Sequence, residues 1–331
     1  MKYNGKKAAK EAAPNARVHH QKNDAGQRLD RFLAKAAPLL PPSLAQKYLR
    51  IKRIKVNGAR AARDRRLNEG DLVECYVNDE FFDAPDAANA YLTIASPRIN
   101  AVYEDENVIL LDKPAGQLCH AGDGGGVTLI DHLLAYLYQK REWRPREENA
   151  FTPALCNRID RNTSGLVIAA KNAEALRILN DKIRGREIAK YYLCVCLGRP
   201  DPPAGRIERI LRKDERENKM RVYRHAVPDG RSAVTLYRTL ESRGGLSLLE
   251  AELLTGRTHQ IRACLADAGH PLLGDGKYGN GAANRTYGES VQLLCSHRLR
   301  FDFPTRAGAL EYLRGREFST APPPFRLKYF G

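Results

Sequence analysis

The sequence lacks several features that define membrane and secreted proteins. No apolar run reaches the ~18 residues that a membrane-spanning helix requires, which excludes a membrane protein. Residues 1–22 contain neither an apolar stretch nor a small-residue cleavage pattern, so we expect no secretory signal there. Their lysine and alanine content is typical of a disordered basic tail.

Paired cysteines are also missing. The seven cysteines show no C-x-x-C pair and no Cys/His spacing of a zinc site, so we expect no metal and a reducing, cytoplasmic location. Cys194 and Cys196 lie in the apolar run 191–197, where a strand would place both on one face. This pattern favours core packing over metal binding.

Nucleotide-binding and hydrolase motifs are absent as well. The glycines of 122–126 do not have the spacing of a dinucleotide fingerprint, and Gly274 to Lys277 are followed by Tyr278 where a Walker loop requires Ser or Thr. Both segments are predicted to be flexible loops. The chain contains no G-x-S-x-G elbow and no H-E-x-x-H helix.

Positive charge is concentrated at one end of the chain. The 331 residues carry 55 basic and 39 acidic side chains, a net charge of +16. Residues 1–66 hold 18 of the basic and four of the acidic side chains, which gives +14, and the remainder holds 37 and 35, which gives +2. A basic module on a nearly neutral body indicates binding to a polyanion through its phosphates. The alternative is a solvated basic face without a ligand.

Residues 23–78 are predicted to form a small α/β module. Leu29, Phe32 and Leu33 have helical spacing, prolines follow, and Ser43 is the predicted N-cap of a second helix. A strand over 54–56 enters an Asn-Gly turn, and a closing strand begins at Leu72. The second helix and the turn after it expose four basic side chains, Lys47, Arg50, Lys52 and Arg53.

The order of these pieces resembles the S-four-like RNA-binding domain. The matching pieces are R-L-D-x-x-L, a basic helix, K-V-N-G and L-x-x-G-D-x-V. The resemblance implies that structured RNA binds at the basic helix and the adjoining turn. Residues 79–98 show no periodicity and are predicted to be a linker.

Residues 99–331 alternate strand-like and helical patterns. We expect a strand pair over 102–111, a helix over 129–138 and a buried strand over 165–170. A helix capped by Asn172 is predicted to end at Gly185, and a strand over 246–254 leads into a helix that Gly269 ends. The predicted class is α+β around a largely antiparallel or mixed sheet.

Asp160 is the candidate chemical group. It lies between Arg158 and Arg161 in the segment N-R-I-D-R-N-T-S-G over 157–165, just before the buried strand. Flanking guanidinium groups should hold a carboxylate ionised, as a nucleophile requires. The alternative, which residue types alone favour, is a salt-bridged aspartate in a turn.

The segment resembles the H-R-L-D-x-x-T-S-G motif of the RluA-type pseudouridine synthase family, large-subunit rRNA type. Other blocks agree in order: D-K-P-A-G from Asp112, K-Y-Y-L from Lys190, and L-T-G-R-T-H-Q-I-R from Leu254, followed by G-H-P and G-D. The resemblance spans about residues 24–305. Asn157 replaces the usual His, and Ile159 replaces Leu.

The resemblance implies conversion of uridine in RNA to pseudouridine without a cofactor. It assigns Asp160 as the essential carboxylate, Tyr192 as the residue that stacks on the base, and Arg257 as the partner of Asp160. The resemblance also implies a set of substrate-contacting residues in the catalytic domain, namely Lys113, Arg158, Arg161, Thr163, His259, Gln260, Ile261 and Arg262.

The expected protein is therefore a cytoplasmic, monomeric isomerase that modifies structured RNA, most readily 23S-type large-subunit rRNA, with no membrane association and no obligate protein partner. Three alternatives stay open: a non-catalytic RNA-binding or ribosome-assembly factor, a tRNA-directed pseudouridine synthase, and a nucleoside glycosidase.

Overall fold

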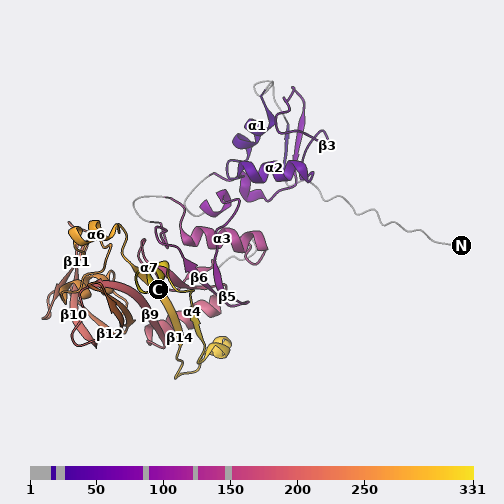
Figure 1. The fold of residues 1–331 in the computed structure, drawn as a ribbon. Coiled ribbons are helices and arrows are strands. Elements are labelled where there is room, and N and C mark those ends of the chain that lie inside the picture. The colour runs from indigo at the N-terminus through magenta and orange to yellow at the C-terminus, as the bar shows by residue number, and fades with distance from the viewer. Residues whose placement is uncertain (1–15, 20–26, 85–88, 122–125, 146–150) are drawn as a thin grey trace. The chain divides into compact units, whose positions relative to one another are not determined.

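A computed structural model describes residues 16–19, 27–84, 89–121, 126–145 and 151–331. The chain divides into two compact units, residues 1–97 and 98–331 (Figure 1). Residues 1–15 of the predicted tail and most of the 122–126 glycine segment lie outside the described residues. No helix in the described ranges is long and apolar enough to cross a membrane.

The first unit contains two helices and a four-stranded sheet. Helices α1 (Leu29–Ala36) and α2 (Pro42–Arg50) bury Leu29, Phe32, Leu33 and Leu49. The antiparallel sheet has the order β1-β4-β2-β3, with β1 at Ala16–His19, β4 at Leu72–Cys75, β2 at Ile54–Val56 and β3 at Ala59–Arg60. Asn57 and Gly58 join β2 to β3 with φ of 52° and 72°, the conformation that an Asn-Gly hairpin turn requires.

Three predictions for this unit are wrong in detail. Residues 16–19 of the expected tail form β1, because they pair with β4. Ser43 is not the N-cap: Pro41 precedes α2 and Pro42 begins it, which suits a position whose N–H has no partner in the helix. The expected linker contains the 3₁₀ helices η2 (Asp79–Phe82) and η3 (Ala90–Thr93), which bury Phe81 and Tyr91.

The second unit is built on an 11-stranded sheet. Nine strands follow the order β11-β10-β12-β13-β9-β14-β8-β6-β5, while β15 pairs with β14 and β7 with β8. Their bounds are β5 Ala101–Glu104, β6 Val108–Lys113, β7 Ala154–Leu155, β8 Ser164–Ala170, β9 Ile188–Leu197, β10 Ala204–Asp214, β11 Lys219–Tyr223, β12 Arg231–Arg243, β13 Leu246–Leu253, β14 Leu294–Phe301 and β15 Glu317–Ser319. Among the strands of the described residues only β14 and β8 pair in parallel, so the predicted mixed, largely antiparallel sheet is confirmed.

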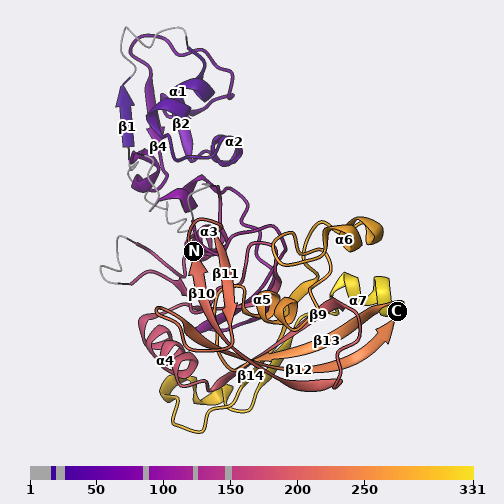
Figure 2. The same cartoon turned by 90° about the vertical axis from the view of Figure 1, so that its left-hand side faces the viewer.

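The helices of this unit begin and end where local sequence signals predict. Thr128 makes a capping box with Asp131 at the start of α3 (Leu129–Lys140). Asn172 caps α4 (Ala173–Arg184), and Gly185 follows it. Helix α5 (Gln260–Asp267) follows β13 and lies against the β10–β11 hairpin (Figure 2). The remaining helices are α6 (Gly281–Tyr287), η4 (Gly308–Leu313) and α7 (Pro324–Phe330).

The sheet supplies the core. Strands β6, β8 and β14 pack against α4 and η4 through side chains such as Leu166, Leu179 and Leu310, all 0% exposed. Cys194 and Cys196 are free, fully buried thiols of β9, which confirms the predicted core role. Gly165 is required at the start of β8, since its φ is +106° and an added Cβ would lie 2.2 Å from the Ser296 carbonyl oxygen.

Candidate active site

Asp160 lies in the loop between β7 and β8. The Thr163 amide donates to the Asp160 carbonyl at 3.0 Å and closes a turn. Asn157 anchors the start of the loop, because its Oδ1 accepts the Ile168 amide at 2.8 Å. The Asn157 substitution that separates this sequence from the family motif therefore provides a hydrogen-bond acceptor for β8.

Lys113 supports the Asp160 loop from inside the protein. Its side chain is 0% exposed, and Nζ donates to the carbonyl oxygens of Pro114, Gln117 and Arg161 at 2.9, 2.8 and 3.0 Å. Burial lowers the pKa of Lys113 to about 8. The expectation that Lys113 contacts substrate is wrong, because all its donors are used within the fold.

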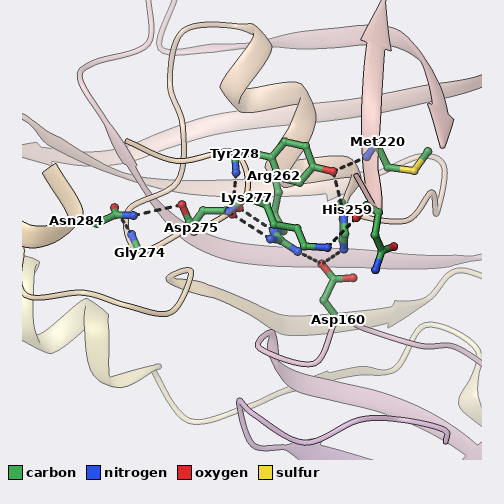
Figure 3. Close-up of polar contacts among 10 residues, drawn as sticks. Asp160, Met220, His259, Arg262, Gly274, Asp275, Lys277, Tyr278 and Asn284 are labelled. Atoms are coloured by element: carbon green, nitrogen blue, oxygen red, sulfur yellow. Dashed lines mark hydrogen bonds and ion pairs between the residues drawn. The ribbon is translucent and has the colours of Figure 1, made fainter. Parts of the chain in front are cut away.

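Arg262, not Arg257, pairs with Asp160. Its Nη1 donates to Asp160 Oδ2 at 2.8 Å, while Nε and Nη2 donate to the two oxygens of Asp275 at 2.7 and 3.0 Å (Figure 3). Arg257 instead donates from Nε to the Ser232 carbonyl at 3.0 Å. The predicted pairing of Arg257 with Asp160 is wrong for this reason, and Arg262 takes its place. The expected contact of Arg262 with substrate stays a prediction.

The flanking arginines do not hold Asp160 either. Arg158 and Arg161 are exposed, and neither forms an ion pair with Asp160. Arg161 donates from Nε to the Gly116 carbonyl at 3.0 Å. The positive charge beside Asp160 therefore comes from a helix distant in sequence.

A bidentate carboxylate fixes Arg262. Asp275 is 1% exposed, and its Oδ1 also accepts the amides of Lys277 and Tyr278 at 2.8 and 3.1 Å. Burial acts to raise the pKa of Asp275, but the hydrogen bond and charge of Arg262 outweigh it and lower the pKa overall. Residues 274–277, predicted as a flexible loop, form this hydrogen-bonded turn.

Tyr278 links the turn to His259 and to β11. Its hydroxyl accepts the Met220 amide at 2.6 Å and lies 3.0 Å from His259 Nδ1 (Figure 3). Burial lowers the pKa of His259, which favours the neutral imidazole. A hydroxyl proton donated to Nδ1 leaves the hydrogen on Nε2, which lies 3.8 Å from Asp160 Oδ2.

Tyr192 lies on β9 between β13 and β14 and is 6% exposed. Burial raises its pKa, and a hydrogen bond with Ser296 opposes this only in part. The phenol is therefore protonated near neutral pH and offers its ring face and a hydroxyl.

Asp160 and Tyr192 line one pocket of about 280 Å³. Other predicted residues line it too, namely Arg158, Thr163, Arg257, His259, Gln260, Ile261 and Arg262. Thr163 is 2% exposed, and its hydroxyl has no partner within the described residues. Gln260 serves the fold, since its Oε1 accepts from the Thr255 hydroxyl and the Arg257 amide at 2.8 and 3.0 Å.

Three residues of this site had no predicted role, namely Lys190, Asp275 and Tyr278. In the sequence, Asp275 belongs to the G-D pair after the last motif block, and Tyr278 stands where a Walker loop requires Ser or Thr. Lys190 also lines the pocket, and burial lowers its pKa. Two positions on one strand separate Lys190 from Tyr192, so strand alternation was the available signal.

Comparisons with known proteins find relatives that cover most of the chain. A family described as RNA pseudouridylate synthase matches residues 107–267. A Vibrio cholerae protein named Ribosomal large subunit pseudouridine synthase C is 31% identical over 87% of this chain and 89% of the relative. A Rickettsia prowazekii protein of the same name is 32% identical over 76% of this chain and 82% of the relative.

The fold is similar to that of solved pseudouridylate synthase structures. Human RNA Pseudouridylate Synthase Domain Containing 4 superposes with a TM-score of 0.53 at 23% identity, covering 69% of this chain and 90% of that one. The predicted α+β class and the predicted family are confirmed. The chain belongs to the RNA pseudouridylate synthase family.

Proposed function

We propose that this pseudouridine synthase acts on large-subunit ribosomal RNA and that Asp160 is its reacting carboxylate. The observation that carries the proposal is the Asp160–Arg262–Asp275 chain at the wall of a nucleotide-sized pocket that also contains Tyr192. The substrate class comes from relatives whose names specify the large ribosomal subunit.

The chemistry follows from these groups. The N1–C1′ bond of uridine breaks, the uracil turns, and a C5–C1′ bond forms, while the C5 proton leaves and N1 gains one. Asp160 attacks C1′ or stabilises the electron-poor sugar, and Arg262 holds the carboxylate in place. Tyr192 stacks on the base. A uridine in structured RNA must leave its stack to enter a pocket of this size.

A glycosidase is disfavoured by the surroundings of Asp160. Retaining and inverting glycosidases require a second carboxyl group that exchanges protons or activates water. The carboxylate nearest along the Arg262 chain is Asp275, whose two oxygens are both occupied by the guanidinium. Asp275 is therefore not available for acid–base work.

The test replaces the carboxylate without changing its size. Asp160→Asn is expected to fold and bind RNA but form no pseudouridine, a loss larger than the ~10² to 10⁴ of an acid or base alone. Tritium release from 5-tritiated uridine RNA and a thermal melt measure both properties. Asp181→Asn, an exposed change on α4, is the matched control.

Each alternative gives a different result in the same assays. Turnover by folded Asp160→Asn would contradict the catalytic assignment. If the protein is a binding or assembly factor, the wild-type protein will release no tritium. If it is a glycosidase, the wild-type protein will release free uracil. Mapping pseudouridine in ribosomal and transfer RNA from cells lacking the protein distinguishes an rRNA from a tRNA substrate.

We also propose that residues 23–78 bind RNA as an S-four-like module. Lys47, Arg50, Lys52 and Arg53 are exposed, as the sequence predicts, and Arg50 lines a surface hollow with Arg60 and Arg63. Lys47→Gln with Arg50→Gln is expected to weaken RNA binding and its salt dependence. Unchanged binding would contradict the module.

We propose a monomer as the active species, because Asp160, Arg262 and Asp275 form their ion pairs within one chain, and a cytoplasmic location, which the free cysteines favour. Turnover per chain is then expected to be independent of protein concentration. Loss of turnover on dilution, together with a change in sedimentation, would contradict it.

A further inference from the structure

A second hollow adjoins the catalytic pocket. It has a volume of about 920 Å³ and lies along the β10–β11 hairpin. Gly256, Arg257 and Thr258 line both this groove and the Asp160 pocket. The two spaces therefore meet at the turn that precedes α5, and we name the second one the hairpin groove.

The hairpin groove has an excess of positive charge. Six basic and three acidic side chains line it. Two of the acids are already neutralised, since Asp214 pairs with Arg221 and Glu215 with Lys213, each at 2.6 Å. Four guanidinium groups form no ion pair with any described residue, those of Arg212, Arg216, Arg231 and Arg257.

This excess stands out against the rest of the chain. Residues 67–331 carry 37 basic and 35 acidic side chains, so the body of the protein is nearly neutral. Four unpaired guanidinium groups against one remaining acid, Asp229, are a local concentration of charge. Guanidinium groups bind phosphate through paired hydrogen bonds, which makes them suited to a nucleic-acid backbone.

The volumes of the Asp160 pocket and the hairpin groove indicate which part of an RNA strand each one can hold. The Asp160 pocket, at about 280 Å³, has room for the target nucleotide but not for its neighbours. The neighbours must leave over the rim, where Arg257 lies. Arg257 is fixed there by its hydrogen bond to the Ser232 carbonyl, next in sequence to Arg231.

We propose that the hairpin groove binds the backbone phosphates of nucleotides that flank the target uridine. This inference rests on the proposed function, because it takes the occupant of the Asp160 pocket to be a nucleotide of an RNA strand. Arg257 is then a phosphate-binding residue at the junction of the two spaces, in place of the carboxylate partner that the sequence suggested.

The hairpin is attached to the catalytic turn. Lys277 Nζ donates to the Asn218 carbonyl at 2.7 Å, and the Met220 amide donates to the Tyr278 hydroxyl at 2.6 Å. Both contacts join the hairpin to the turn whose Asp275 holds Arg262. A strand bound in the groove is therefore held in a fixed position relative to Asp160.

The test removes two charges that support nothing in the fold. The side chains of Arg216 and Arg231 are exposed and form no hydrogen bond with described residues. Arg216→Gln with Arg231→Gln should lower affinity for large-subunit RNA about tenfold and flatten the plot of log affinity against log salt by roughly 1.4, from ~0.7 per contact. KM should rise while kcat stays near wild type.

The matched control is Arg243→Gln with Arg306→Gln. These arginines are also exposed and unpaired within the described residues, but they line no part of the groove. The control loses the same net charge and should bind as wild type does.

Each outcome decides a separate point. The groove proposal would be overturned if the groove variant kept wild-type affinity and salt slope, or if the control lost as much affinity. In either case, tritium release by the wild-type protein would still uphold the proposed function. No tritium release by wild type, with weaker RNA binding in the groove variant alone, would overturn the function and keep the groove as an RNA site.

Discussion

Arg262 Nη1 lies 2.8 Å from Asp160 Oδ2, although 102 residues separate the two in sequence. Burial acts to lower the pKa of Arg262, but the hydrogen bonds and charges of Asp275 and Asp160 outweigh it and raise the pKa overall. The guanidinium thus stays charged at any pH the fold tolerates. Three further groups around this pair can be tested separately.

Asp275→Asn is expected to lower kcat by about 10²-fold or more. The amide keeps the size of the side chain but turns an NH₂ toward the guanidinium, so Arg262 no longer has a fixed position beside Asp160. Arg262 keeps Asp160 but loses its bidentate partner, and breaking a buried ion pair costs up to ~3 to 5 kcal/mol of stability. Steady-state kinetics and a thermal melt measure the two effects, and wild-type kcat in the folded fraction would show that Asp275 does not position Arg262.

Tyr278→Phe is expected to reduce turnover while leaving the ring against Arg262. The change removes the partner of the Met220 amide and of His259 Nδ1, at ~1 to 3 kcal/mol for each buried group left unsatisfied. Nitrogen NMR shifts of His259 should show a changed tautomer ratio. Tyr287→Phe is the control, since that hydroxyl bonds to the Gly244 carbonyl away from the site; equal effects of both changes would refute the role of Tyr278.

Tyr192→Phe is expected to lower turnover by ~10² to 10⁴ with a modest loss of RNA affinity, because the stacking ring remains and only the hydroxyl is lost. Tyr191 is the matched control. It lies on the opposite face of β9, where the Arg298 guanidinium carbon is 3.9 Å from its ring centre. Tritium release should be normal for Tyr191→Phe, and a normal rate for Tyr192→Phe would mean that the ring acts by packing alone.

Glu104 is expected to make stability depend on pH. Burial acts to raise its pKa, but Lys140, Lys171 and the Tyr136 hydroxyl, at 2.8, 2.9 and 2.8 Å, outweigh it and lower the pKa from 4.5 to about 2. A lowered carboxyl pKa contributes stability above pH 4.5 that is lost as pH falls toward 2, up to about 3 kcal/mol.

Melts of wild type and Glu104→Gln between pH 3 and 7 measure this contribution. The difference between the two proteins should be largest at pH 7 and shrink below pH 4.5. A difference that is the same at every pH would show that the glutamate acts through packing and not through its charge.

The sequence by itself determined the local structure of the catalytic unit. Thr128 and Asn172 begin helices through side chains that satisfy free amides, and Gly185 follows the second of these helices. Alternation placed Cys194 and Cys196 in the core, and the motif blocks selected Asp160 and Tyr192, which line one pocket. These features depend on neighbours within a few residues, which a sequence displays directly.

Only the tertiary structure decided which basic side chain serves Asp160. Arg257 and Arg262 belong to one motif, but α5 begins between them after His259 at a φ of +54°. The change from turn to helix sends the two guanidinium groups in different directions, one to the Ser232 carbonyl and the other to Asp160. The roles of Lys113 and Asp275 likewise follow from their burial. The partner of a buried charge depends on which parts of the chain pack together, and the spacing of residues in the sequence does not show this.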